Sequence, residues 1–208
     1  AHPGERPVFD FSGVLPPTNR VTAFQVGASD CVFKGFDVVG VQVTQTGANT
    51  QSECFRVPGG NRNRFEQLAM HDGMGIGLYL TSGQSNLVLN CDAYRNSGLD
   101  SFSIGNVDGF GGHPSNTLSS GNGFRGCRAW FNSDDGFDCI NAKAVVTFDN
   151  CWAFYNGTNY WNDPQFNGNG QGFKLGGNYV GAPHRLARSV AFRNESNGVD
   201  QNNNNEGQ

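Results

Sequence analysis

Short stretches in which apolar and polar residues alternate follow one another along the chain, with polar turns between them. Gly123–Trp130 alternates in this way, a polar corner follows at Asn132–Gly136, and Phe137–Ile140 alternates again. Alternation with a period of two is typical of a strand with one buried face. The pattern therefore predicts repeating units, each with a short strand, a turn, a second short strand and a second turn.

Two phrases recur within these units, and matching positions stand about 24 residues apart. One phrase, Asp-Gly-Phe or a close variant, begins at Asp108, Asp135, Gln171 and Asn197. The other, which has a small residue at its centre, begins at Asn90, Gly126, Asn150 and Ser189. Repeats of this length favour an all-β parallel β-helix, in which matching positions stack in columns. The pattern of leucine-rich repeats is missing, and a propeller blade needs about 40 residues.

Composition supports a single all-β domain over residues 1–208. Gly makes up 30 of the 208 residues and charged residues only 15%, and both Gly and Asn permit the left-handed backbone of tight turns. The first 30 or so residues lack the repeat, so we expect them to cap the N-terminal coil. The chain ends just after the run Asn202–Asn205 with no capping segment, and we expect missing C-terminal coils or a partner to cover this open end.

Several columns predict structural stacks. Asparagines recur at one corner and are expected to form a ladder of amides, which the run Asn202–Asn205 would extend; its members are Asn96, Asn132, Asn156 and Asn194. Cys91, Cys127 and Cys151 share a column and are expected to be buried. Cys31 and Cys54 stand about one repeat apart and are the expected disulfide in a secreted protein.

Two coils are longer than the others, with extra residues around Ser97–Asn106 and around Thr158–Asn169. Long loops on one side of a solenoid usually wall a binding site. The second loop carries Tyr160 and Trp161, whose rings are suited to stacking on sugars. The alternative is that both loops only cover the solenoid.

An acidic cluster is the main candidate for chemistry. Asp134, Asp135 and Asp138 lie in one corner and the strand that leaves it, and Asp108 falls in the column of Asp135 one coil earlier. Four converging carboxylates repel one another unless a cation neutralises them. Oxygen ligands without Cys or His indicate a hard ion, and a flexible corner suits Ca²⁺ better than Mg²⁺. The alternative is a solvated turn without metal.

Lys174 occupies the column of Asp138 and Gly111, and the chain has only two other lysines. A bound dication would disfavour the ammonium, so we expect the pKa of Lys174 to fall and the amine to act as a general base. The alternative is a salt bridge with Asp138. Metal and base together suit abstraction of a proton next to a carboxylate, followed by β-elimination of the glycosidic bond of a uronic-acid polymer. Candidate substrate-binding residues are His113, Tyr160, Trp161, His184, Arg185 and Arg188.

The net charge of −4 argues against a general electrostatic attraction to nucleic acid or to an anionic membrane. No apolar run approaches about 18 residues, so no membrane span is expected. The sequence starts at Ala1 rather than Met, as in a processed secreted protein. We expect a secreted protein that is monomeric or paired with a missing C-terminal segment.

The motifs resemble those of the family 9 polysaccharide lyases, and the likeness extends from about residue 64 to the end of the chain. The stretches that carry it are Val107–Phe110, Gly121–Trp130, Asn132–Asp138, Gly172–Gly177 and Gly198–Asn204. The resemblance implies a right-handed parallel β-helix and a Ca²⁺-dependent lyase acting on pectate or rhamnogalacturonan. It also implies that Asp108, Asp134, Asp135 and Asp138 are calcium ligands and that Lys174 is the base.

This chain departs from the family pattern in having Gly111-Gly112-His113 where relatives carry a basic residue, and it is shorter at its C-terminal end. Two other functions stay open. One is a β-helix that binds glycan through calcium without catalysis, for which a base at Lys174 is not required. The other is a glycosidase similar to polygalacturonase, with Asp134, Asp135 and Asp138 as acid and base.

Overall fold

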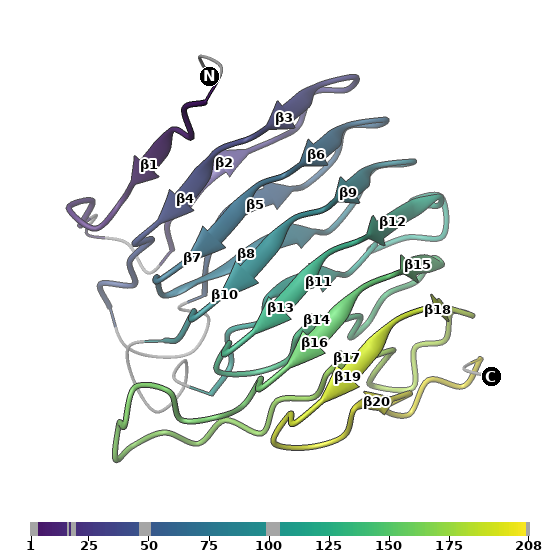
Figure 1. Ribbon diagram of the computed structural model, residues 1–208. Helices are drawn as coiled ribbons and strands as arrows, with labels where there is room; N and C mark the ends of the chain where they lie inside the picture. The colour runs from purple at the N-terminus through teal and green to yellow at the C-terminus, as the bar shows by residue number, and fades with distance from the viewer. Residues whose placement is uncertain (1–3, 16, 18–19, 46–50, 99–104, 207–208) are drawn as a thin grey trace.

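The computed structural model describes residues 4–15, 17, 20–45, 51–98 and 105–206. Over these residues all regular elements are β-strands, which form three sheets that run along one solenoid (Figure 1). Sheet 1 contains, in spatial order, β1 (Val8–Asp10), β4 (Asp37–Val39), β7 (Ala69–His71), β10 (Asp92–Tyr94), β13 (Arg128–Trp130), β16 (Trp152–Phe154) and β19 (Val190–Phe192). Sheet 2 contains β2 (Thr22–Gln25), β5 (Ser52–Val57), β8 (Gly75–Leu80), β11 (Phe110–Gly112), β14 (Phe137–Asp138), β17 (Phe173–Lys174) and β20 (Val199–Asp200). Sheet 3 contains β18 (Arg185–Ala187), β15 (Val146–Asp149), β12 (Asn122–Arg125), β9 (Leu87–Leu89), β6 (Arg64–Glu66) and β3 (Val32–Lys34).

Neighbouring strands in every sheet are parallel, and their register confirms the columns expected from the repeat. Ala93, Ala129 and Ala153 are paired across β10, β13 and β16. The aromatic residue of the second phrase is likewise aligned, with Phe137 opposite both Phe110 and Phe173. The all-β parallel β-helix is therefore confirmed.

Each coil contains three strands rather than the expected two. The stretch Gly123–Trp130 divides into β12 and β13, because the chain turns at Gly126 between sheet 3 and sheet 1. Gly126 has a φ of 64°, and Asn90 and Asn150 take the same left-handed conformation at the matching turns. Gly and Asn tolerate this conformation better than other residues. Alternation alone does not reveal the turn, because the apolar and polar pattern continues through it.

The interior consists of stacked columns of aromatic and small residues. Phe110, Phe137 and Phe173 stack with ring centroids 5.1 and 4.8 Å apart, and none is exposed. The column of Cys91, Cys127 and Cys151 is buried, as expected. Stacking along the solenoid axis means that each coil buries its apolar side chains mainly against its two neighbours.

The expected disulfide does not form: Cys31 and Cys54 are both free thiols. Cys31 lies just before β3 of sheet 3, whereas Cys54 lies within β5 of sheet 2. Their separation of about one repeat therefore does not place them in one column, because the coils differ in length and the two positions are out of register.

The asparagine ladder forms as expected. Each side-chain amide donates to the next amide oxygen, over 3.1 Å from Asn96 to Asn132, 3.1 Å from Asn132 to Asn156 and 2.9 Å from Asn156 to Asn194. The run Asn202–Asn205 does not extend this ladder, since the amides of Asn202 and Asn204 instead donate to backbone carbonyls of Gly176 and Leu175. A second ladder at another corner was not expected; its members are Asn63, Asn86 and Asn122.

The first coil of the solenoid includes residues that precede the part of the sequence in which the repeat can be recognised. Within the first 30 residues, β1 pairs with β4 and β2 pairs with β5.

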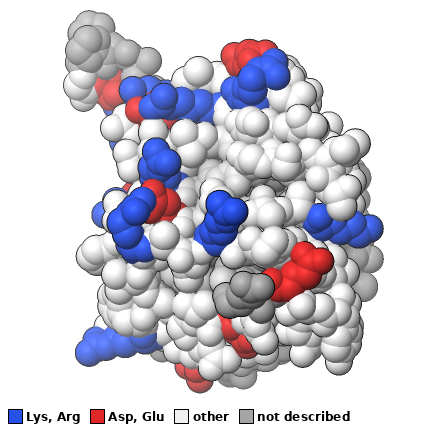
Figure 2. Space-filling model, turned by 90° about the vertical axis from the view of Figure 1, so that its right-hand side faces the viewer, with Lys and Arg blue, Asp and Glu red and all other residues white. Residues whose placement is uncertain are grey.

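Figure 2 shows one face of the molecule, on which lysine and arginine side chains form small separate groups among uncharged residues. In the described part of the chain, no helix has the length and apolar character needed to cross a membrane.

Candidate functional site

The acidic cluster lies at the corner where the chain passes from sheet 1 to sheet 2. Asp108 precedes β11, and Asp134 and Asp135 precede β14 one coil later. The Asn132 amide, which donates to the carbonyl of Ala93, holds the backbone just ahead of the aspartates. The backbone N–H of Asp135 donates to Asp108 Oδ1 over 3.2 Å. The repeat alignment that predicted this convergence is correct for the three residues.

One carboxylate oxygen from each of Asp108, Asp134 and Asp135 lies within 4.8 Å of the others. The three residues are 4%, 7% and 1% exposed. Burial and mutual repulsion raise the pKa of Asp108 and of Asp134 well above the ordinary value, and they raise the pKa of Asp135 to about 6. Without a cation, this corner therefore holds more negative charge than it can stabilise at neutral pH.

Lys174 lies on β17 directly opposite Asp138 on β14, as expected. Its Nζ is 3.0 Å from Asp135 Oδ2 and 3.8 Å from Asp138 Oδ1. The salt bridge with an aspartate, weighed as an alternative from the sequence, is therefore present, with Asp135 as the nearer partner. We expected a lowered pKa beside a dication; here burial lowers the pKa of Lys174, but the surrounding carboxylates raise it by more, so the net shift is upward.

Asp138 differs from the other three aspartates in its surroundings. Its Oδ2 lies 3.2 Å from His113 Nε2, and its Oδ1 accepts a hydrogen bond of 2.8 Å from the backbone of Ile140. Burial acts to raise the pKa of Asp138, but the charges of His113 and Lys174 and the hydrogen bonds lower it overall. Asp138 therefore stays ionised and lies between the base candidate and His113.

Tyr79 is a residue of this region that we did not expect from the sequence. It lies on β8 in the column that continues through Gly111 and Asp138 to Lys174. A Cβ at Gly111 would lie 2.5 Å from the Tyr79 ring, so only glycine leaves room for this ring. The ring packs edge-on against His113, with centroids 4.9 Å apart. The alternation in Gly75–Leu80 was the signal that could have identified Tyr79 as outward-facing.

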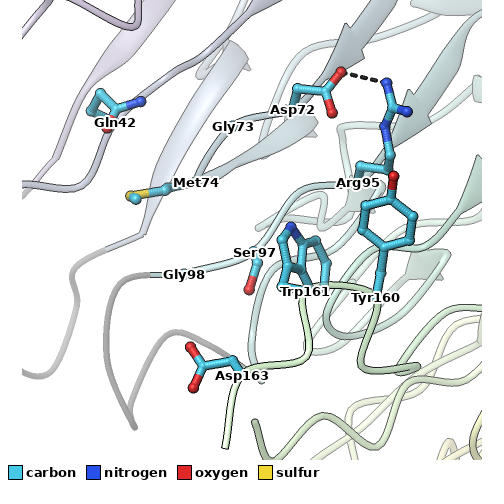
Figure 3. Close-up of a pocket in the computed structure, with 10 residues that line it drawn as sticks. All are labelled: Gln42, Asp72, Gly73, Met74, Arg95, Ser97, Gly98, Tyr160, Trp161 and Asp163. Atoms are coloured by element: carbon cyan, nitrogen blue, oxygen red, sulfur yellow. Dashed lines mark hydrogen bonds and ion pairs between the residues drawn. The ribbon is translucent and has the colours of Figure 1, made fainter. Parts of the chain in front are cut away.

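Tyr160 and Trp161 line a different hollow, of about 340 Å³, outside the acidic cluster. Figure 3 shows them near Arg95, whose guanidinium pairs with Asp72 over 2.5 Å. One side of the hollow is formed at the same corner by coils nearer the N-terminus than the aspartates, including Asp72 and Arg95, and the other by the loop that follows β16. The loop around Thr158–Asn169 thus borders a hollow, whereas residues 99–104 of the other long loop lie outside the described residues.

The structure places three further candidates away from the acidic cluster of Asp108, Asp134 and Asp135. Arg185 lies on β18 of sheet 3, and Arg188, just beyond it, pairs with Asp149 over 2.6 Å. The Nδ1 of His184 accepts a hydrogen bond from the backbone of Val146, and burial lowers the pKa of this residue to about 4. Proximity in sequence to Lys174 suggested a shared site, but the chain has already left sheet 2 and entered sheet 3 at these residues.

The residues present fit a hard divalent cation. The donors are buried carboxylate oxygens, and burial together with repulsion from neighbouring aspartates raises the pKa of Asp108 and of Asp134. Calcium accepts six to eight oxygen ligands at 2.3–2.6 Å, and carboxylates from two coils can supply several of them. Fold and site together define the class: a parallel β-helix with an oxygen-donor site at one corner, beside an aligned lysine.

Known proteins share this architecture. The family described as "Pel9A-like, right handed beta helix region" matches residues 1–208. Pectate lyase L of Dickeya dadantii (strain 3937) is 47% identical over 204 residues, which cover 96% of this chain and 44% of that protein. Pectate lyase L of Paenibacillus polymyxa (strain SC2) is 31% identical, with coverage of 98% and 45%.

Solved structures agree with these sequence matches. The crystal structure of pectate lyase Pel9A matches with a TM-score of 0.79 and 42% identity, over 96% of this chain and 47% of that one. A rhamnogalacturonan lyase matches with a TM-score of 0.84 and 45% identity, over 93% and 50%. This chain thus spans about half the length of the relatives it matches. The chain belongs to the Pel9A-like right-handed β-helix family, which confirms the resemblance to the family 9 polysaccharide lyases.

Proposed function

We propose that this chain is the β-helix part of a secreted, calcium-dependent lyase that cleaves an acidic polysaccharide such as pectate or rhamnogalacturonan by β-elimination. The observation that carries the proposal is the placement of Lys174 in register with Asp138 and within 3.0 Å of Asp135. A base candidate thus lies at the edge of a buried carboxylate cluster. Relatives named as pectate and rhamnogalacturonan lyases support the substrate class.

Asp108, Asp134 and Asp135 would hold the calcium ion, with Asp138 beside them as the fourth carboxylate of the set. When bound, calcium would polarise a uronate carboxylate and thereby acidify the proton on the adjacent carbon. Its positive charge would also offset the carboxylates that now raise the pKa of Lys174. Calcium binding and the availability of a neutral amine at Lys174 are therefore coupled in this proposal.

The reaction needs one proton acceptor at the sugar. The Lys174 amine takes the proton from C5 of the uronate, and the electron pair of that C–H bond forms the C4–C5 double bond. The C4–O bond breaks, and the departing sugar oxygen takes a proton from water. His113 and the backbone of Ile140 keep Asp138 ionised next to Lys174, which positions the ammonium that forms.

The test is the ultraviolet absorbance of the unsaturated uronate product. Polygalacturonate and rhamnogalacturonan would be incubated with the wild type, with Lys174→Ala and with Lys34→Ala, each in Ca²⁺ and in EDTA. We expect absorbance to rise only in Ca²⁺, and Lys174→Ala to lower the rate at least about 100-fold, as loss of a general base typically does. Lys34, paired with Glu66 on sheet 3, serves as the matched control and should leave the rate unchanged.

Two results would replace this proposal. Calcium-dependent binding of the polymer without any product would indicate a glycan-binding β-helix. New reducing ends without absorbance would indicate a glycosidase that uses two aspartates as acid and base.

A further inference from the structure

A hollow of about 270 Å³ lies beside Asp138, at the opposite end of the sheet 2 strands from the acidic cluster. Tyr79, His113 and Lys143 are among its lining residues. They come from three successive coils, because Tyr79 lies on β8, His113 follows β11 and Lys143 follows β14.

Backbone hydrogen bonds hold the walls of the hollow in place. The N–H of Lys143 donates to the carbonyl of Pro114 over 2.8 Å, and the N–H of Ser115 donates to the carbonyl of Thr81 over 2.9 Å. The N–H of His113 donates to Leu80 over 2.8 Å. Because adjacent coils are tied to one another here, the hollow exists before any ligand binds.

The hollow continues directly from the proposed catalytic residues. His113 touches Asp138, whose other oxygen lies 3.8 Å from Lys174 Nζ. On its other side His113 packs against the Tyr79 ring. A polymer with one unit at Lys174 that runs along sheet 2 toward β8 therefore places its next unit near Asp138 and His113, with Tyr79 farther along, three strands from Lys174.

Lys143 gives the hollow a positive charge. The other two lysines are paired, Lys34 with Glu66 and Lys174 with Asp135. Lys143 is exposed, and no ion pair is formed by its ammonium among the described residues. The residues that line the hollow include no carboxylate. A cation at a preformed hollow without a carboxylate is suited to an anionic group of the ligand.

We propose that this hollow is a subsite for the sugar unit next to the one that reacts, and that Lys143 binds the carboxylate of that unit. The inference rests on the proposed function for the identity of the polymer. It adds a specificity: a polymer with a carboxylate on every unit, such as polygalacturonate, is preferred over rhamnogalacturonan, in which acidic and neutral units alternate.

Binding tests the subsite without requiring turnover. Calorimetry with trigalacturonate in Ca²⁺ would compare Lys174→Ala with the double variant Lys174→Ala/Lys143→Met, and Lys174→Ala/Lys34→Met is the matched control. We expect Lys143→Met to weaken binding about tenfold or more, the range of a hydrogen bond to a charged group. The fully methyl-esterified trisaccharide should show no difference between the variants, because its carboxylates are blocked.

Turnover separates a failure of the subsite from a failure of the lyase. In the Lys174-intact protein, Lys143→Met should raise KM on polygalacturonate and leave the rate on rhamnogalacturonan nearly unchanged. Equal trigalacturonate affinity in the Lys143 and Lys34 variants, or wild-type activity confined to rhamnogalacturonan, overturns the subsite while β-elimination stands. Lost binding in the Lys143 variant without any unsaturated product from the wild type supports the subsite and rejects the lyase.

Discussion

Charge balance at individual residues decides what the acidic corner can do. Asp108, Asp134 and Asp135 share a volume in which their oxygens come within 4.8 Å of one another. Burial disfavours the charged form of each carboxyl and also strengthens the mutual repulsion, and both effects raise their pKa values. The same carboxylates raise the pKa of Lys174. A general base at this position therefore depends on a second positive charge nearby.

Replacing one carboxylate of the cluster should weaken calcium binding more than it weakens the fold. We expect Asp134→Asn to lower Ca²⁺ affinity at least about tenfold, since even partners behind metal ligands contribute 10–100-fold. Stability without metal should stay the same or increase, because one buried charge is removed. Calorimetric titration with Ca²⁺ and urea unfolding in EDTA measure the two effects. Asp163→Asn, on the exposed loop, is the control; equal Ca²⁺ affinity in both variants would place the ion elsewhere.

Within the elements, hydrogen-bonded columns position the functional side chains. The corner that carries Asp134 follows directly after Asn132, a rung of the amide ladder. Gly109 and Gly136 lie close against this ladder: a Cβ at either position would approach a ladder amide to within 2.8 Å. The Asp-Gly-Phe phrase thus combines a candidate metal ligand, a close approach of two coils and a core aromatic in three consecutive residues.

Removing the side-chain amide of Asn132 from the asparagine ladder should destabilise the corner that carries the aspartates. Asn132 is fully buried, and its amide donates to both Ala93 and Asn156. We expect Asn132→Ala to lower the free energy of unfolding by about 2–4 kcal/mol, because buried partners lose their hydrogen bonds. Urea unfolding measures the change, and the exposed Asn197→Ala should cost less than about 1 kcal/mol. Similar losses in the two variants would show that the ladder contributes little.

At the scale of the whole molecule, the solenoid is stabilised mainly by contacts between neighbouring coils. Repulsion at the acidic corner therefore lowers the stability of each coil that contributes a carboxylate to it. Asp135 connects β11, β14 and β17 through its contacts with Asp108 and Lys174. The matched relatives are about twice as long as this chain, so the coils described here are one part of a larger architecture in those proteins. A global property such as the pH dependence of unfolding should therefore report on this corner.

The raised pKa of the Asp135 carboxyl predicts how the free energy of unfolding without metal varies with pH. Its folded pKa of about 6 lies above the ordinary value of 3.8, so the folded state binds the proton more tightly. This contribution is present below pH 4 and is lost as the pH rises through 6, an effect of about 3 kcal/mol. Saturating Ca²⁺ should remove the loss, because the ion binds the deprotonated form and stabilises the folded state.

Urea unfolding from pH 4 to 7.5, in EDTA and in Ca²⁺, measures this dependence as the difference between wild type and Asp135→Asn. The difference isolates one carboxyl from other groups that titrate in the same range. A difference that does not change with pH in EDTA would mean that the Asp135 carboxyl is not perturbed.

The sequence by itself determined the repeat, and with it the all-β solenoid, the columns and the convergence of Asp108 with Asp134 and Asp135. These follow from the period of the pattern, because matching positions in a parallel β-helix must stack. The tertiary structure alone decided the third strand of each coil, the free state of Cys31 and Cys54, and the separation of His184, Arg185 and Arg188 from the site. It also decided the direction of the Lys174 pKa shift and the place of Tyr79. These features depend on turns, on distances between coils and on the balance of buried charges. The repeating pattern of the sequence does not determine any of them.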